Sequence, residues 1–198
     1  RADVDAVMIS TPDHWHVPIS IAAIRAGKDV LCEKPTLTVR EGRMLVETAQ
    51  RYAAVFGTST EDRSLGVYLR IAELCRNGRL GKLQRIYVKL PAGPNNPADP
   101  TPQPVPADLD WDMWLGPAPY APYCAARMHW NFRWIRDYSG GQLTDWGAHC
   151  IDTAQWASDT ESTGPVSVEG TGKRHDKGLY DTYYEYHIKY TYADGLEL

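Results

Sequence analysis

Apolar runs alternate with amphipathic segments over the first 57 residues. Short apolar runs at 4–10, 28–32 and 54–57 predict strands, and the segments between them, 17–26 and 38–53, have the pattern of helices. Thr38 and Glu41 have the spacing of a capping box. This order predicts a partial doubly wound (Rossmann) α/β fold with a parallel sheet, and the nearly continuous apolar first run favours a sheet covered on both faces.

The pattern changes after this region. Residues 64–78 and 145–157 predict helices, and residues 83–90, 166–172 and 180–193 predict strands. Ten of the 14 prolines lie within 91–122, which predicts irregular backbone there. We therefore expect two domains, 1–60 and 61–198, the second an α+β domain with a predominantly antiparallel open sheet.

Composition narrows the class of protein. With 21 Lys+Arg against 25 Asp+Glu the net charge is −4, which argues against a nucleic-acid partner. No apolar run approaches the ~18 residues of a membrane-spanning helix. The four cysteines are widely spaced, which favours free thiols over a zinc site or disulfides. We expect a cytoplasmic protein, with the periplasm as the alternative.

Polar clusters follow the predicted strands. Residues 10–16 (STPDHWH) follow the first strand, and Glu33-Lys34-Pro35 follows the second. Ligands of open parallel sheets bind beyond the carboxyl ends of the strands, so both clusters face one crevice. The alternatives are a helix-capping turn for Thr11-Pro12-Asp13 and a plain polar loop for Glu33-Lys34-Pro35.

A third cluster lies in the helix predicted at 145–157. Asp145 and His149 are four residues apart, on one helix face, and form a plausible proton-handling pair. Asp152 is placed to hydrogen-bond the His149 ring. The alternative is an N-cap aspartate beside a satisfied histidine. A metal site would need His14, His16, Asp145 and His149 together, which nothing in the sequence ensures, and we expect none.

Together these clusters resemble the Gfo/Idh/MocA family of NAD- or NADP-dependent oxidoreductases. Ser10–His16, Glu33-Lys34-Pro35 and the stretch 140–152 carry the resemblance. It implies hydride transfer between the cofactor and a sugar, polyol or related carbohydrate, in a protein that forms homo-oligomers through its C-terminal sheet.

The resemblance also implies roles for single residues. Lys34, Asp145 and His149 are the implied catalytic residues: His149 as general base, Asp145 orienting it or binding a hydroxyl, and Lys34 stabilising the alkoxide. Asp13 stands where many members have Asn, and Glu61 where related sequences often have Gln. Arg133 and Trp134 lie near the site in some members and receive no role here. The implied cofactor-binding residues are Thr11, Pro12, Asp13, His16, Glu33, Lys34 and Pro35.

The sequence departs from the family pattern in one respect. The G-x-G-x-x-G turn and the acidic ribose-binding residue of the first β-α-β unit are missing. We therefore expect a piece of a longer protein, truncated also in its C-terminal sheet, with weakened cofactor affinity. Three alternatives stay open: an NAD-dependent glycoside hydrolase of the same broad family, a non-catalytic truncated chain, and a metal-dependent sugar isomerase.

Overall fold

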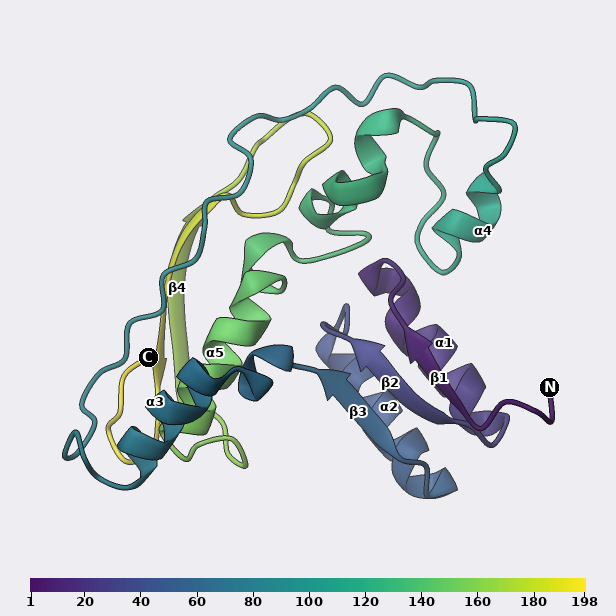
Figure 1. Cartoon of the computed structure of the whole chain (residues 1–198). Helices are drawn as coiled ribbons and strands as arrows, with labels where there is room; N and C mark the ends of the chain where they lie inside the picture. Colours follow the sequence, from purple (N-terminus) through teal and green to yellow (C-terminus); the bar gives the residue numbers. More distant parts are fainter.

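A parallel sheet forms the first part of the chain. The computed structural model describes all residues 1–198. Strands β1 (Ala6–Ile9), β2 (Asp29–Glu33) and β3 (Phe56–Ser59) lie in the order β1-β2-β3, all parallel (Figure 1). The carboxyl ends of the three strands therefore meet at one edge, as the strand–helix order predicts.

Two helices cover one face of this sheet. Helices α1 (Asp13–Arg25) and α2 (Val39–Tyr52) pack with the sheet around one apolar cluster: Ile9, Val17, Ile24, Val30, Cys32 and Leu45. The predicted capping box forms, because the Thr38 hydroxyl accepts from the Glu41 N–H and the Glu41 carboxylate accepts from the Thr38 N–H. Residues 1–198 place no helix over the other face, where Met8 and Leu31 are 67% and 44% exposed. The expectation of cover on both faces thus holds for one face of the described chain.

Helix α1 begins at Asp13, four residues before the predicted start. Residues 13–16 join the helix because the side chains of His14 and His16 find partners away from water. The His14 Nε2 lies 2.9 Å from the carbonyl oxygen of Trp114, and the His16 ring lies between the carbonyl oxygens of Thr11 and Pro35, 2.8 Å from each. The local sequence pattern predicts a loop at these polar residues, but tertiary contacts bury His14 and His16 in the first turns of α1.

The second part combines helices with an antiparallel pair of strands. A 3₁₀ helix, η1 (Glu61–Ser64), leads into α3 (Gly66–Arg76), which packs on α5 (Trp146–Ala157). Strands β4 (Ser167–Lys173) and β5 (Glu185–Thr191) pair antiparallel. Residues 180–184 were expected to extend β5. They stay outside it because the N–H groups of Asp181 and Thr182 both donate to the Trp134 carbonyl.

The strand predicted at 83–90 does not form. This segment is extended, but its only bridge joins Arg85 to Glu197. A cavity of about 630 Å³ separates its remainder from β5. A strand needs a paired neighbour along its length, and residues 87–90 make no backbone hydrogen bond to one.

The proline-rich segment 91–122 runs along the outside of the molecule (Figure 1). Together with the residues that follow it, it forms a second apolar core. It is irregular as predicted, apart from the short helix α4 (Trp111–Leu115), which begins where the Asp110 carboxylate accepts from the Met113 N–H. Three short 3₁₀ helices follow: η2 (Ala125–Arg127), η3 (His129–Trp134) and η4 (Gly141–Leu143). The second core includes Trp111, Leu115, Phe132, Trp134 and Tyr138.

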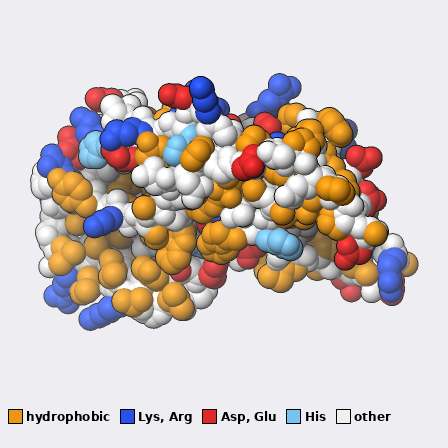
Figure 2. All heavy atoms as spheres, turned by 90° about the horizontal axis from the view of Figure 1, so that it is seen from above, with side chains coloured by type: hydrophobic (Ala, Val, Ile, Leu, Met, Phe, Trp, Pro, Cys, Tyr) orange, Lys and Arg blue, Asp and Glu red, His pale blue; other side chains and the backbone are white.

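The surface carries charges of both signs, and the cysteines are unpaired. Charged side chains of both signs are interspersed with apolar ones on the face shown in Figure 2. No helix has the length and apolar character needed to cross a membrane. All four cysteines are free thiols.

Candidate active site

A cavity of about 480 Å³ lies at the carboxyl ends of β1 and β2, where the two parts of the chain meet. Residues after β1 and β2 line one side, and segments from the second part line the other. Seven of the residues expected at the site line this cavity: Thr11, Pro12, Asp13, His16, Glu33, Lys34 and Asp145. The structure therefore brings together the clusters after the first and second strands and the start of α5.

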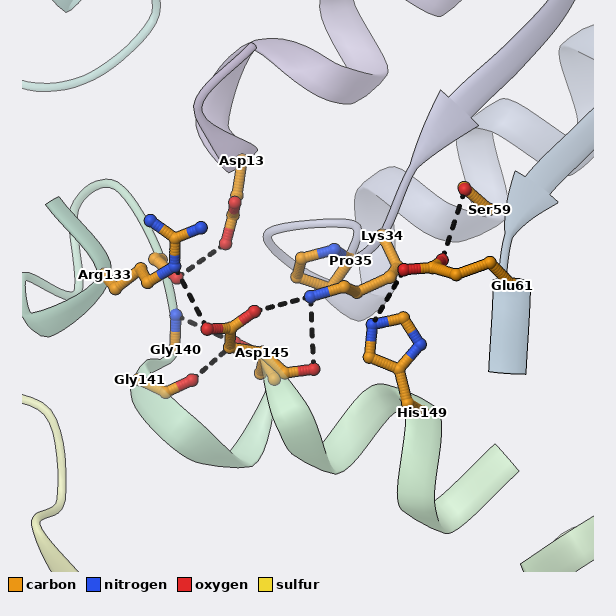
Figure 3. A network of polar contacts seen from close by, with 12 residues as sticks. Asp13, Lys34, Pro35, Ser59, Glu61, Arg133, Gly140, Gly141, Asp145 and His149 are labelled. Atoms are coloured by element: carbon orange, nitrogen blue, oxygen red, sulfur yellow. Dashed lines mark hydrogen bonds and ion pairs between the residues drawn. The ribbon is translucent and has the colours of Figure 1, made fainter. Parts of the chain in front are cut away.

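Asp145 joins two cations inside this cavity. Its Oδ1 accepts from Lys34 Nζ at 2.5 Å, and its Oδ2 accepts from Arg133 Nε at 3.0 Å (Figure 3). Asp145 occupies the N-cap position of α5, but its carboxylate caps no N–H and turns to the two cations instead. The side chains of Lys34 and Asp145 are only 12% and 13% exposed, so this is a largely desolvated ion pair.

Lys34 keeps one donor free. Its ammonium donates to the Asp145 carboxylate and, at 3.2 Å, to the Asp145 carbonyl oxygen. An ammonium has three N–H donors and no acceptor, so one N–H remains for an oxygen of a bound molecule.

His149 lies on the adjacent turn of α5 and faces a different group. Its Nε2 is 3.7 Å from Glu61 Oε1, and its Nδ1 is buried without a partner (Figure 3). The expectation that Asp152 hydrogen-bonds the His149 ring is wrong. Asp152 instead accepts two hydrogen bonds from the Arg63 guanidinium, at 2.6 and 2.7 Å. This bidentate pair holds η1 against α5 and so keeps Glu61 opposite His149.

Asp13 is another carboxyl group that lines the cavity, beside Asp145 and Glu33. It is 8% exposed, and its Oδ2 accepts from the Ser139 hydroxyl at 2.5 Å. Burial raises the pKa of Asp13 to about 6, although the Ser139 hydroxyl and the charges of His16, Lys34 and Arg133 act in the opposite direction. Asp13 thus differs from Asp145 in having no cation in direct contact.

Two of the histidines after β1 serve the fold. His14 is 1% exposed, and burial lowers its pKa. His16 lines the cavity but holds the Thr11 and Pro35 backbones through both ring nitrogens. Both contacts are hydrogen bonds only when both nitrogens carry a proton. Pro35, which follows a cis peptide bond, takes part through its carbonyl oxygen and does not line the cavity.

Two family models match this chain. Residues 1–59 match the family model described as "Oxidoreductase family, NAD-binding Rossmann fold", and residues 96–198 match that described as "Oxidoreductase family, C-terminal alpha/beta domain". The chain belongs to the Gfo/Idh/MocA oxidoreductase family. The part that matches the Rossmann-fold model coincides with the parallel sheet and its two helices.

Individual relatives align over parts of the chain. The 1,5-anhydro-D-fructose reductase of Ensifer adhaerens is 40% identical over 81 residues, which are 40% of this chain and 24% of the relative. Glycosyl hydrolase family 109 protein 1 of Shewanella sp. (strain ANA-3) is 48% identical over 52 residues, 26% of this chain and 11% of the relative. A solved levoglucosan dehydrogenase, complexed with NADH and levoglucosan, has the same fold, with a TM-score of 0.70 at 20% identity. That comparison covers all of this chain and 48% of the dehydrogenase, so the chain spans about half of its length.

One side chain in the cavity fits the nicotinamide end of the family's cofactor. The Thr11 hydroxyl is buried without a partner in the chain, and Thr11 lines the cavity. A carboxamide, which both donates and accepts, would satisfy it. Thr11 would thus contact that end of the cofactor, with Pro12 and Glu33 beside it in the cavity lining, and residues 1–198 contain no glycine-rich turn for its phosphates.

Sequence reasoning left without a role two residues that contact the aspartates of this cavity, Arg133 and Ser139. Arg133 was noted by resemblance, but only the fold shows that it shares the Asp145 carboxylate with Lys34. Ser139 carries no sequence signal beyond its place before two glycines. Within residues 1–198 no group of three or more His, Cys, Asp or Glu side chains is placed to hold a metal ion.

Proposed function

We propose that this protein is an oxidoreductase that transfers a hydride between NAD or NADP and a secondary hydroxyl of a sugar, polyol or related carbohydrate. In this proposal residues 1–60 contact the cofactor and residues 61–198 hold the substrate. The convergence of Lys34, Asp145 and Arg133 on the 480 Å³ cavity carries the proposal. The cofactor accepts or supplies the hydride, and the chain supplies positioning and charge.

Lys34 is proposed to stabilise the alkoxide. As a carbinol carbon loses hydride, negative charge develops on its oxygen, and the free N–H of Lys34 can donate to that oxygen. Asp145 and its carbonyl oxygen hold the ammonium in place from the other side. Because both partners are largely buried, the donor needs little reorganisation during the reaction.

Proton removal is assigned to His149, as the family resemblance implies. The Glu61 carboxylate lies 3.7 Å from His149 Nε2 on the far side of the ring from its buried, unpartnered Nδ1. Asp145 has both oxygens engaged by Lys34 and Arg133, so its proposed role is to position these cations rather than to orient His149.

Binding and hydride transfer test this proposal. NAD and NADP are titrated into the 198-residue chain and followed by tryptophan fluorescence, and a panel of sugars and polyols is assayed by absorbance of the reduced cofactor. Micromolar binding and net reduction support the proposal. Absence of binding favours the non-catalytic alternative. In an active chain, Lys34→Ala and His149→Ala should each lower turnover by about 100-fold or more, while Lys89→Ala serves as a control away from the cavity.

A glycoside hydrolase is the second candidate. The 48% identity to a glycosyl hydrolase family 109 protein favours it, but that match covers only 52 residues. Release of a leaving group from a glycoside without net reduction of the cofactor would support the hydrolase. Net reduction with a free sugar would count against it. Loss of activity with a chelator would instead indicate the metal-dependent isomerase.

Assembly and location belong to the same proposal. We propose a cytoplasmic homo-oligomer that associates through the β4–β5 region. Light scattering coupled to size-exclusion chromatography measures the mass directly, and a monomer at all accessible concentrations would contradict the oligomer.

A further inference from the structure

We propose that Asp13 is a second proton acceptor of this site, acting on the substrate hydroxyl from the side of the cavity opposite Asp145. The inference rests on the proposed hydride transfer. It assigns a chemical role to a residue that the family resemblance associates only with cofactor contact.

Two of the three carboxyl groups that line the cavity, Asp13 and Asp145, have opposite surroundings. Asp145 contacts two cations, Lys34 and Arg133, one on each of its oxygens, and both favour its charged form. Asp13 contacts only the neutral Ser139 hydroxyl, through Oδ2, and its Oδ1 has no partner in the chain. Figure 3 shows Asp13 reaching from the first turn of α1 toward Arg133 and Asp145. Two acids held in such different environments are suited to different tasks, one as a fixed anion and one as a proton carrier.

Asp13 is held firmly in this position. Both Asp13 and Ser139 are buried, at 8% and 2% exposure, and their hydrogen bond joins the two parts of the chain. A group so constrained loses little freedom when it meets a substrate. The free Oδ1 is not sealed off, because Asp13 lines the 480 Å³ cavity.

The charged groups around Asp13 come from several elements. His16 lies on α1, Lys34 follows β2 and Arg133 lies on η3, and all three favour the carboxylate form. Glu33 and Asp145 line the same cavity and oppose it. Burial outweighs the cations and holds the pKa of Asp13 near 6, so both of its protonation states are accessible close to neutral pH.

The step conserves atoms and charge. The C–H bond of the carbinol breaks and its hydride passes to the oxidised nicotinamide. The O–H bond breaks and its proton passes to the Asp13 carboxylate. The carbinol becomes a carbonyl compound, and the protonated Asp13 then returns the proton to solvent.

The pH dependence of the rate tests this inference. Asp13 lines the 480 Å³ cavity that contains Lys34, whereas His149 does not. If Asp13 takes the proton, the rate of substrate oxidation in the wild-type chain should fall as pH drops through about 6. In Asp13→Asn the rate should fall at least about 10-fold near neutral pH and lose this acidic limb.

Ser139→Ala is the variant that distinguishes chemistry from structure. It keeps the carboxyl group but removes the hydroxyl that lowers the pKa of Asp13, so the acidic limb should move to higher pH. Asp112→Asn, an exposed substitution on α4, is the matched control and should leave the profile unchanged. A purely structural Asp13 would lower the rate without moving any limb.

Carbon NMR of the Asp13 carboxyl provides a readout without turnover. We expect its resonance to titrate near pH 6 in the wild-type chain and higher in Ser139→Ala. The inference is overturned if the wild-type carboxyl titrates near the ordinary value of about 4, or if Asp13→Asn retains the wild-type pH profile. If the wild-type chain transfers no hydride at any pH, the proposed function fails, and the role of Asp13 fails with it.

Discussion

The ion pair between Lys34 and Asp145 should measurably stabilise the folded chain. It links residues 111 positions apart in the sequence, and both side chains are nearly buried, at 12% and 13% exposure. Asp145→Asn keeps the shape of the side chain but removes its charge. This leaves Lys34 and Arg133 near each other without a counter-ion.

The expected magnitude follows from this burial. Breaking a buried ion pair by removing one partner costs about 3–5 kcal/mol, and the residual exposure here reduces the expected loss to about 2–3 kcal/mol. With a urea m-value of about 2 kcal/mol/M for a chain of this size, the unfolding midpoint should fall by about 1–1.5 M. The Lys34→Met, Asp145→Asn double variant should recover part of this loss, because no isolated lysine charge remains.

Urea unfolding followed by tryptophan fluorescence and circular dichroism measures this effect. Glu169→Gln is the control, because its pair with Lys189 is 3.6 Å long and Glu169 is 68% exposed. Its loss should stay below about 0.5 kcal/mol. The reasoning is refuted if Asp145→Asn shifts the midpoint no more than Glu169→Gln does, or if the double-mutant cycle shows no coupling.

Three other predictions follow from local geometry. Gly116→Ala would place a Cβ 2.1 Å from the Trp15 ring at a φ of +50°, so it should destabilise by about 3 kcal/mol. Gly27→Ala, at φ +75° with open space around it, should cost only about 1 kcal/mol, and equal losses in urea unfolding would contradict the clash. Thr38→Ala removes the α2 cap and should cost about 1 kcal/mol by thermal unfolding; an unchanged melting temperature would count against it. The folded-state pKa of Asp13 is raised, so the stability it contributes is present at low pH and lost as pH rises through about 6. Asp13→Asn should therefore gain up to about 2 kcal/mol over wild type above pH ~7 and nothing near pH ~4, and a pH-independent difference would contradict this.

Much of the first part of the chain could be predicted from local pattern. The three strands, the second helix and its Thr38 cap follow from periodicity and from residues three apart, which act within a single turn. The start of α1 could not be predicted in this way. His14 and His16 enter that helix because carbonyl oxygens from Trp114 and Pro35 lie beside their rings.

Some contacts of the candidate site could likewise be predicted from the sequence, and others could not. Parallel strands bring their carboxyl ends to one edge, so the meeting of Thr11 and Lys34 could be predicted from strand order. The partners of Asp145 could not, because Lys34 and Arg133 reach it from elements that meet it only in the folded chain. For Asp152, helical spacing suggested His149, but the docking of η1 on α5 places the Arg63 guanidinium 2.6 and 2.7 Å from its two oxygens.

The sequence by itself determined the strand–helix order, the polar residues after each strand and hence the family. Those properties depend on side-chain periodicity and on residues close together in the chain. Only the tertiary structure decided which charges meet, that residues 87–90 lack a paired neighbour, and that Asp13 is buried beside Ser139. Each of these depends on how distant segments pack, because desolvation and pairing set the energy of a charge or an open strand edge, and neither is a property of the local sequence.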